Sequence, residues 1–253
     1  MIWTDTHCHI HDSQFFPEGG HALYERARAA GVWRMITVGT DSESSKAAAR
    51  FAASHDECFA AVGIHPHDAK AELAEFDEFV SWCKNANNQT LVAVGEIGLD
   101  YYYDHSPREQ QKELLNRQIE LAQQLNVPII FHVREAFDDF WPIVDAFHGL
   151  RGVVHSFTDS IANMEQALSR GLYVGVNGIA TFARERDDVT GAIPLDRLLL
   201  ETDAPFLTPT PYRGKVNEPA FVTHVAQFVA DLRSISLEEL SNETEMNAQK
   251  LFF

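Results

Sequence analysis

Short apolar runs rich in β-branched residues alternate with amphipathic stretches along the chain. The apolar runs fall at residues 1–7, 35–39, 59–64, 91–96, 128–133, 152–156, 172–176 and 198–202, and their length and composition predict buried β-strands. Apolar positions recur at helical spacing in residues 22–30, 42–54, 73–85, 107–125, 162–170, 219–232 and 237–251. Ser106, Pro107 and Glu109 have the arrangement of a helix start, with Ser106 as the predicted N-cap.

Eight strands separated by helices predict an α/β protein with a single (β/α)8 TIM barrel and an active site at the C-terminal ends of the strands. A doubly wound open sheet is the alternative, but no G-x-G-x-x-G motif follows the first strand. The 253 residues are 45% hydrophobic and contain no Pro/Ser-rich linker, so we expect residues 1–253 to form one domain.

Composition narrows the possible partners and the location. The net charge of −17 argues against an extended basic surface for polyanions, so positive charge would have to be concentrated locally, as bound metal. The three cysteines form no CxxC pair, which favours reduced thiols and a cytoplasmic location. No run approaches the roughly 18 apolar residues of a membrane span, so no membrane association is expected.

Histidine and carboxylate side chains stand at or just after the ends of the predicted strands. In a barrel these ends meet on one face, where active sites are built. Strand alternation places His7 and His9 of "DTHCHIHD" on the same side. The candidate metal ligands are His7, His9, Glu96, His132, His155 and Asp203.

This donor set suits divalent metal chemistry. Imidazole nitrogens suit borderline divalent ions and carboxylates can bridge two of them, which indicates a site for two metal ions such as Zn, Mn or Mg. A lone histidine at a strand end is usually structural, but so many polar groups at one face are costly to bury without a ligand. We expect Glu96 and Asp203 to be catalytic, with metal-activated hydroxide attacking an ester or amide bond.

Other polar residues near the predicted face are candidates for substrate contact. His65 of "GIHPH" and Arg134, two residues after His132, are placed to hold a phosphate. His11 continues the histidine alternation but lies beyond the predicted strand, and we expect it in an exposed loop. The run Tyr101–Tyr103 indicates either a stacking surface for a base or a packed rim.

The motifs together resemble a known family. "DTHCHIHD", "VGIHPH", "VGEIGLDYYYD", "PIIFHVREA", "VVHSF" and "LLETDAPFLTPTPYRGKVNEP" are similar to the signatures of the TatD-type metal-dependent hydrolases, within the amidohydrolase-like TIM barrels. The resemblance spans nearly the whole chain. It implies a divalent-metal hydrolase of phosphodiesters, with several deoxyribonucleases among its relatives. It also implies that one metal is held by His7, His9 and Asp203, the second by His132 and His155, with Glu96 bridging them.

Three functions remain open at this point. The leading hypothesis is hydrolysis of a phosphoester, in DNA or a nucleotide, by a hydroxide that Asp203 orients, while His65 and Arg134 steady the phosphate and Arg213 orders the rim. The second is hydrolysis of an amide or ester bond in a small metabolite, which the acidic composition favours. The third is a non-catalytic metal-binding barrel, which is less consistent with ligands that leave room for water.

Overall fold

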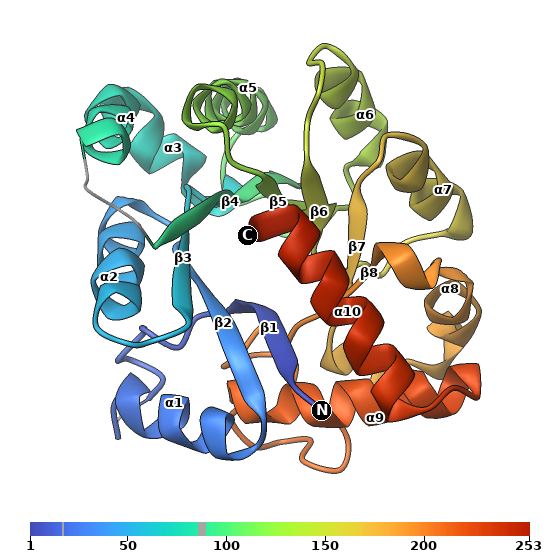
Figure 1. Ribbon diagram of the computed structural model, residues 1–253. Coiled ribbons are helices and arrows are strands. Elements are labelled where there is room, and N and C mark those ends of the chain that lie inside the picture. The colour runs from blue at the N-terminus through green and yellow to red at the C-terminus, as the bar shows by residue number, and fades with distance from the viewer. Residues whose placement is uncertain (17, 86–89) are drawn as a thin grey trace. The chain divides into compact units, whose positions relative to one another are not determined.

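The computed structural model describes residues 1–16, 18–85 and 90–253. Within these residues, eight strands follow one another in the sheet in the order of the sequence (Figure 1). They are β1 (Trp3–Cys8), β2 (Val32–Val38), β3 (Cys58–Val62), β4 (Leu91–Asp100), β5 (Ile129–Arg134), β6 (Gly152–Val154), β7 (Tyr173–Val176) and β8 (Leu198–Leu200). A doubly wound sheet reverses its strand order at a switch point, and this one does not. The predicted (β/α)8 TIM barrel fold is confirmed.

Helices separate the strands and follow the last one. The α-helices are α1 (Gly20–Ala29), α2 (Ser42–Ala53), α3 (Ala69–Glu72), α4 (Phe76–Asn85), α5 (Arg108–Leu125), α6 (Phe137–Asp145), α7 (Ile161–Ser169), α8 (Asp187–Ala192), α9 (Val222–Arg233) and α10 (Leu237–Phe252). The short 3₁₀ helices are η1 (Pro66–Asp68), η2 (Leu73–Glu75), η3 (Gly178–Thr181), η4 (Arg184–Arg186), η5 (Leu195–Arg197) and η6 (Pro219–Phe221). In the part of the chain that the structure describes, no helix has both the length and the apolar character that a membrane crossing needs.

The predicted N-cap at Ser106 is wrong. Helix α5 begins at Arg108, and Pro107 occupies the cap position. The Ser106 hydroxyl is buried and bonded elsewhere: it donates to the carbonyl of His67 at 2.6 Å and accepts from the amide of Lys70 at 3.0 Å. Ser106 therefore binds the backbone of the segment from His67 to Lys70, which follows β3, and does not cap helix α5.

The described residues fall into two compact units. The first unit comprises Met1–Thr37, His155–Leu251 and Phe253, and the second comprises Val38–Val154 and Phe252. The expectation of one domain over residues 1–253 stays a prediction, and each unit is described by itself below.

In the first unit, strand β1 is buried along its whole length, including the polar residues Asp5, Thr6 and His7. It pairs in parallel with β2, and Cys8 forms a β-bridge with Ala204, which follows β8. Strands β7 and β8 also pair in parallel. Parallel strands of this kind are covered on both faces, so polar side chains on β1 lie in the interior and need partners there.

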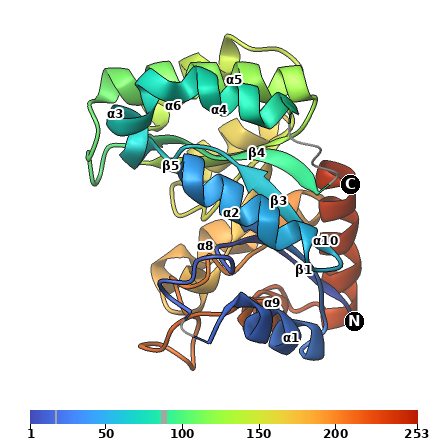
Figure 2. The ribbon, with the colours of Figure 1, turned by 90° about the vertical axis from the view of Figure 1, so that its left-hand side faces the viewer.

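In the second unit, β3, β4, β5 and β6 pair successively in parallel. Figure 2 shows helices α3 to α6 grouped along one side of β4 and β5. Two buried glutamines of α5 bind the backbone at the strand ends. The Gln118 amide accepts from Ile64 N at 2.8 Å and donates to Ile64 O at 2.9 Å, and Gln111 makes the same pair of bonds to Asp100 at 2.9 and 3.2 Å. Helix α5 thus holds the segments that carry His65 and Asp100.

Candidate metal centre

The first group of metal-ligating side chains lies in the first unit, at the end of β1. His7 Nε2 and His9 Nε2 lie 3.5 and 3.4 Å from the same oxygen, Asp203 Oδ1. Two backbone hydrogen bonds hold the segments together: Asp203 N donates to His7 O at 2.8 Å, and His9 N donates to Ala204 O at 2.7 Å. The backbone of β1 and of the segment after β8 therefore sets the positions of all three ligands.

Asp5 holds the backbone beside these ligands through hydrogen bonds to Thr202 and His7. Its carboxylate accepts from Thr202 N at 2.9 Å, from Thr202 Oγ1 at 2.6 Å and from His7 N at 3.3 Å. Complete burial raises the pKa of the Asp5 carboxyl to about 8, although the hydrogen bonds from Thr202 oppose the rise. Asp5 thus links β1 to Thr202, the residue directly before Asp203.

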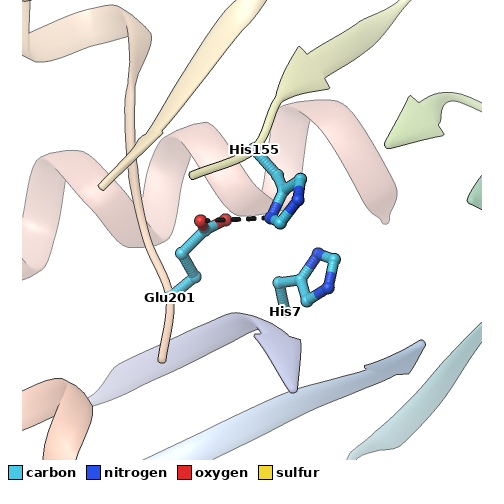
Figure 3. A group of neighbouring side chains, drawn as sticks. All are labelled: His7, His155 and Glu201. Atoms are coloured by element: carbon cyan, nitrogen blue, oxygen red, sulfur yellow. Dashed lines mark ion pairs between the residues drawn. The ribbon is translucent and has the colours of Figure 1, made fainter. Parts of the chain in front are cut away.

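His155 lies beside His7 in the same unit. The two imidazole rings are stacked, with centroids 4.1 Å apart and planes 14° apart. Figure 3 shows the Glu201 carboxylate directed at His155, with Oε1 3.5 Å from Nδ1. The same oxygen accepts from Ser156 N at 2.6 Å and from Asn177 Nδ2 at 3.4 Å. Glu201 is almost completely buried, and the bonds from Ser156 and Asn177 hold its Oε1 beside His155 Nδ1.

The second group lies in the second unit, on β4 and β5 and after β3. His132 Nδ1 is 2.7 Å from Glu96 Oε1, and His65 Nε2 is 3.7 Å from the same oxygen. Strand β4 approaches β5 so closely here that a Cβ atom on residue 98 would lie 1.7 Å from the His132 carbonyl oxygen. Only glycine fits at this position, and Gly98 has a φ of +156°. Burial, followed by the charge of His132, holds the pKa of His65 well below its ordinary value, which keeps this imidazole neutral.

Asp100 extends this second group. Its Oδ2 lies 3.0 Å from both His132 Nε2 and His67 Nε2, and its Oδ1 accepts from the amides of Tyr102 and Tyr103 at 3.1 and 2.9 Å. Burial opposes ionisation of Asp100, but the hydrogen bonds from His132 and His67 outweigh it and hold the pKa of the carboxyl below its usual range. Asp100 is therefore an ionised acceptor behind His132.

The spacing of the donor atoms fits divalent ions. Ligand atoms about 2.1 Å from an ion at tetrahedral angles are about 3.4 Å apart, which matches the contacts of His7 and His9 with Asp203. Three groups have ligand atoms within 4.8 Å of one another: His7, His9 and Asp203; His7, His155 and Glu201; and His65, Glu96 and His132. The 2.7 Å contact of His132 with Glu96 is a hydrogen bond, so a metal ion there would take the place of its proton.

All six predicted metal ligands thus belong to these groups, four in the first unit and two in the second. His155 lies with His7 and Glu201, whereas His132 lies with Glu96 and Asp100. The expectation that His132 and His155 share an ion, with Glu96 as the bridge, stays a prediction. His65, expected to contact substrate, is placed among the candidate metal ligands of the second unit.

The structure gives the contacts of His11 and of the two arginines that were predicted to bind substrate. Arg134 is exposed and stacks on Tyr102, and Arg213 lies with its guanidinium carbon 3.7 Å from the Phe182 ring centroid and donates to Thr208 O. Their contacts with substrate stay predictions. His11 is half-buried, with Nδ1 2.7 Å from Thr37 Oγ1, so the expectation of an exposed loop residue is wrong.

Sequence reasoning missed Asp100 and Glu201. Asp100 lies on β4, four positions after Glu96, and Glu201 directly follows β8, two positions before Asp203. The signal for Glu201 was its place near the end of the predicted strand at 198–202, where candidate ligands are expected. For Asp100 the signal depended on β4 continuing past Glu96, which it does.

Buried histidine–carboxylate groups at the strand ends of a (β/α)8 fold define a metal-dependent hydrolase. The family model for TatD related DNase matches residues 4–253, and the chain belongs to this family. The metal-dependent hydrolase YabD of Bacillus subtilis is 39% identical over 253 residues, 98% of each chain. The 3'-5' ssDNA/RNA exonuclease TatD of Erwinia amylovora is 36% identical over 247 residues, 94% of this chain and 95% of its own.

Solved structures agree with this membership. The structure of YJJV, a TatD homologue from Escherichia coli, has a TM-score of 0.92 and 31% identity, covering 99% of this chain and 97% of its own. A TatD family hydrolase from Entamoeba histolytica has a TM-score of 0.90 and 25% identity, covering 100% and 98%. The resemblance identified from the sequence motifs is confirmed.

Proposed function

We propose that this hydrolase cleaves phosphodiester bonds in single-stranded nucleic acid. The observation that carries the proposal is the convergence of His7, His9 and Asp203, whose donor atoms have the spacing of ligands around one divalent ion. The relative from Erwinia amylovora is named as an exonuclease of ssDNA and RNA, which supports nucleic acid as the substrate class.

Two divalent ions are part of the proposal. His7, His9 and Asp203 would hold one, and Glu96 and His132, with His65 beside them, would hold the other. The histidine-rich donor set favours Zn, Mn or a similar borderline ion. When bound, such ions lower the pKa of water and withdraw charge from phosphate oxygens.

The side chains orient the reactants. Burial raises the pKa of Asp203, but the hydrogen bond from His9 and the charges of His7 and His155 outweigh it, so this pKa lies below its ordinary value. An ionised Asp203 can accept a hydrogen bond from the attacking water and so orient a lone pair of the water oxygen toward phosphorus. Arg134 and Arg213 are exposed cations that can pair with phosphate oxygens.

The test is a substrate panel with metal-loaded and chelator-treated protein. The panel contains single-stranded DNA, RNA, duplex DNA, a bis-aryl phosphodiester, and small amides and esters. We expect turnover of the single strands and the small phosphodiester, abolished by chelator and lowered at least about a hundredfold by Asp203→Asn. Asp188→Asn, at an exposed acid on α8, is the matched control and should retain activity. Turnover of amides or esters alone would contradict the proposal and favour the small-metabolite hydrolase.

The location is part of the same proposal. Among the described residues Cys8, Cys58 and Cys83 are buried and form no disulfide, which is consistent with a reducing compartment and supports a cytoplasmic location. Fractionation of the source cells with a periplasmic marker as reference would test it.

A further inference from the structure

Two exposed tyrosines and one arginine lie together in the segments at the ends of β4 and β5. The guanidinium carbon of Arg134 lies 4.1 Å from the ring centroid of Tyr102 and 4.8 Å from that of Tyr103. The two rings are perpendicular, with centroids 4.9 Å apart, and His105 stacks on Tyr103 at 5.7 Å with planes 8° apart. We name Tyr102, Tyr103 and Arg134 the aromatic platform.

The platform is not a packed rim. Tyr102 and Tyr103 are 54% and 51% exposed, although large aromatic side chains are usually mostly buried. Their neighbour Tyr101 behaves differently: its hydroxyl donates to Asp139 at 2.7 Å, and its ring is covered by Arg108. Of the "YYY" run, the second and third members are exposed, whereas Tyr101 is half-buried.

The platform is joined to the second metal-ligating group. The amides of Tyr102 and Tyr103 both donate to Asp100 Oδ1, while Oδ2 of the same carboxylate contacts His132. The ring of Tyr103 also contacts His67, with centroids 5.4 Å apart. Because Asp100 joins Tyr102 and Tyr103 to His132, a nucleotide whose phosphate binds at His132 lies close to the rings of the platform.

Arg134 sets the chemistry of the platform. Among the described residues its guanidinium has no ion pair and no hydrogen bond, in a chain with a net charge of −17. The N–H groups of Arg134 are thus available for a phosphate, and the tyrosines supply the faces on which any base can stack. An exposed ring pair with an unpaired cation matches a nucleotide better than an apolar protein segment, because residues 101–107 of this loop contain no Leu, Ile, Val or Met.

We propose that the aromatic platform is a nucleobase-stacking subsite for single-stranded nucleic acid. It rests on the proposed function, since it concerns the substrate of that site. One base of this substrate stacks on the ring of Tyr102, with the perpendicular ring of Tyr103 at its edge, and one phosphate pairs with Arg134. Stacking of this kind tolerates any base, so the subsite selects single strands over duplex without selecting sequence.

The test measures binding without hydrolysis. A fluorescein-labelled single-stranded oligonucleotide of about ten nucleotides is titrated with the full chain in EDTA, and fluorescence anisotropy gives the Kd. We expect Tyr102→Ala with Tyr103→Ala to raise Kd about tenfold or more, and Tyr102→Phe with Tyr103→Phe to leave it within about twofold, since stacking needs the ring and not the hydroxyl. The matched control is Trp33→Ala, because Trp33 is 43% exposed and stacks 4.0 Å from the Arg28 guanidinium at the start of β2.

An abasic oligonucleotide of equal length and charge separates stacking from charge. Wild-type protein should bind it more weakly than the normal strand, and the double alanine variant should lose no further affinity. No binding by the wild-type chain, equal binding by the alanine variant, or an equal loss on the abasic strand would overturn the subsite. Because hydrolysis plays no part here, these outcomes are distinct from a failure of the proposed function, which the metal-loaded substrate panel reports.

Discussion

Replacing Asp100 with asparagine tests how the second unit orients a metal ligand. Asp100 accepts four hydrogen bonds, two from imidazoles at Oδ2 and two from backbone amides at Oδ1. An asparagine oxygen can keep the two backbone bonds, but its amide nitrogen cannot accept from His132 or His67. The substitution thus removes two bonds and leaves the local backbone in place.

The magnitude follows from these two bonds. Hydrogen bonds to a charged group contribute about 1.5–3 kcal/mol each, but His67 is partly exposed and water can replace its bond. We therefore expect Asp100→Asn to lower the free energy of unfolding of the metal-free chain by about 2–3 kcal/mol. Loss of the acceptor behind His132 should also weaken metal binding about 10–100-fold, or roughly 1.4–2.8 kcal/mol.

Two assays measure the two effects. Urea unfolding in EDTA gives the stability, and calorimetric titration with Zn²⁺ or Mn²⁺ gives the metal affinity. Asp104→Asn is the control, because Asp104 lies in the same loop but is exposed, with Arg108 as its ion-pair partner at 3.4 Å. An Asp100→Asn chain with wild-type stability and wild-type metal affinity would refute the orienting role.

Three further predictions concern the rest of the chain. Burial raises the pKa of the Cys58 and Cys83 thiols to about 12, whereas thiols of the unfolded chain ionise near pH 8.5, so rising pH stabilises the unfolded state. Between pH 8.5 and 9.5, urea unfolding should therefore show the free energy of unfolding falling by about 1 kcal/mol per thiol. The double substitution Cys58→Ala and Cys83→Ala should remove this pH dependence. Asn217→Ala should lower the free energy of unfolding by about 3 kcal/mol. The buried Asn217 side chain donates to Thr202 O and Phe206 O and accepts from Glu218 N, and alanine loses all three bonds. Val216→Ala, at the exposed neighbouring residue, should change this free energy by less than about 0.5 kcal/mol. For an ion present at a hundred times its Kd, chelation should lower the free energy of unfolding by about 2.7 kcal/mol and lower Tm with it, and an unchanged Tm would contradict tight binding in the native state.

Much of the site could be predicted from the sequence because it depends on local rules. Strand alternation places His7 and His9 on one side, and the parallel strands of a barrel end at one face. The hydrophobic pattern, which locates the strand ends, therefore predicts that the histidines and carboxylates at those ends come together. The parts that were missed depend on contacts between distant segments. Nothing local indicates that Ser106 binds the carbonyl of His67, or that His11 meets Thr37.

Asp100 shows the same limit in another form. The apolar pattern of β4 weakens at Gly98, where a side chain would collide with the His132 carbonyl oxygen. That glycine allows β4 to continue beside β5 to Asp100, but in the sequence it indicates the end of a strand. The length of the strand, and with it the position of the carboxylate behind His132, depended on the close approach of a segment more than thirty residues away.

Metal content per chain tests the central claim most directly. Protein loaded with a divalent ion and dialysed against chelator-treated buffer is analysed for metal, for the wild type, Asp203→Asn and His132→Ala. Two separate ligand groups predict about two ions in the wild type and about one in each variant, with hydrolysis of single-stranded DNA lost in both. A wild-type chain that binds no divalent ion, or variants that keep the full wild-type content, would contradict the assignment of these residues as the metal centre of the enzyme.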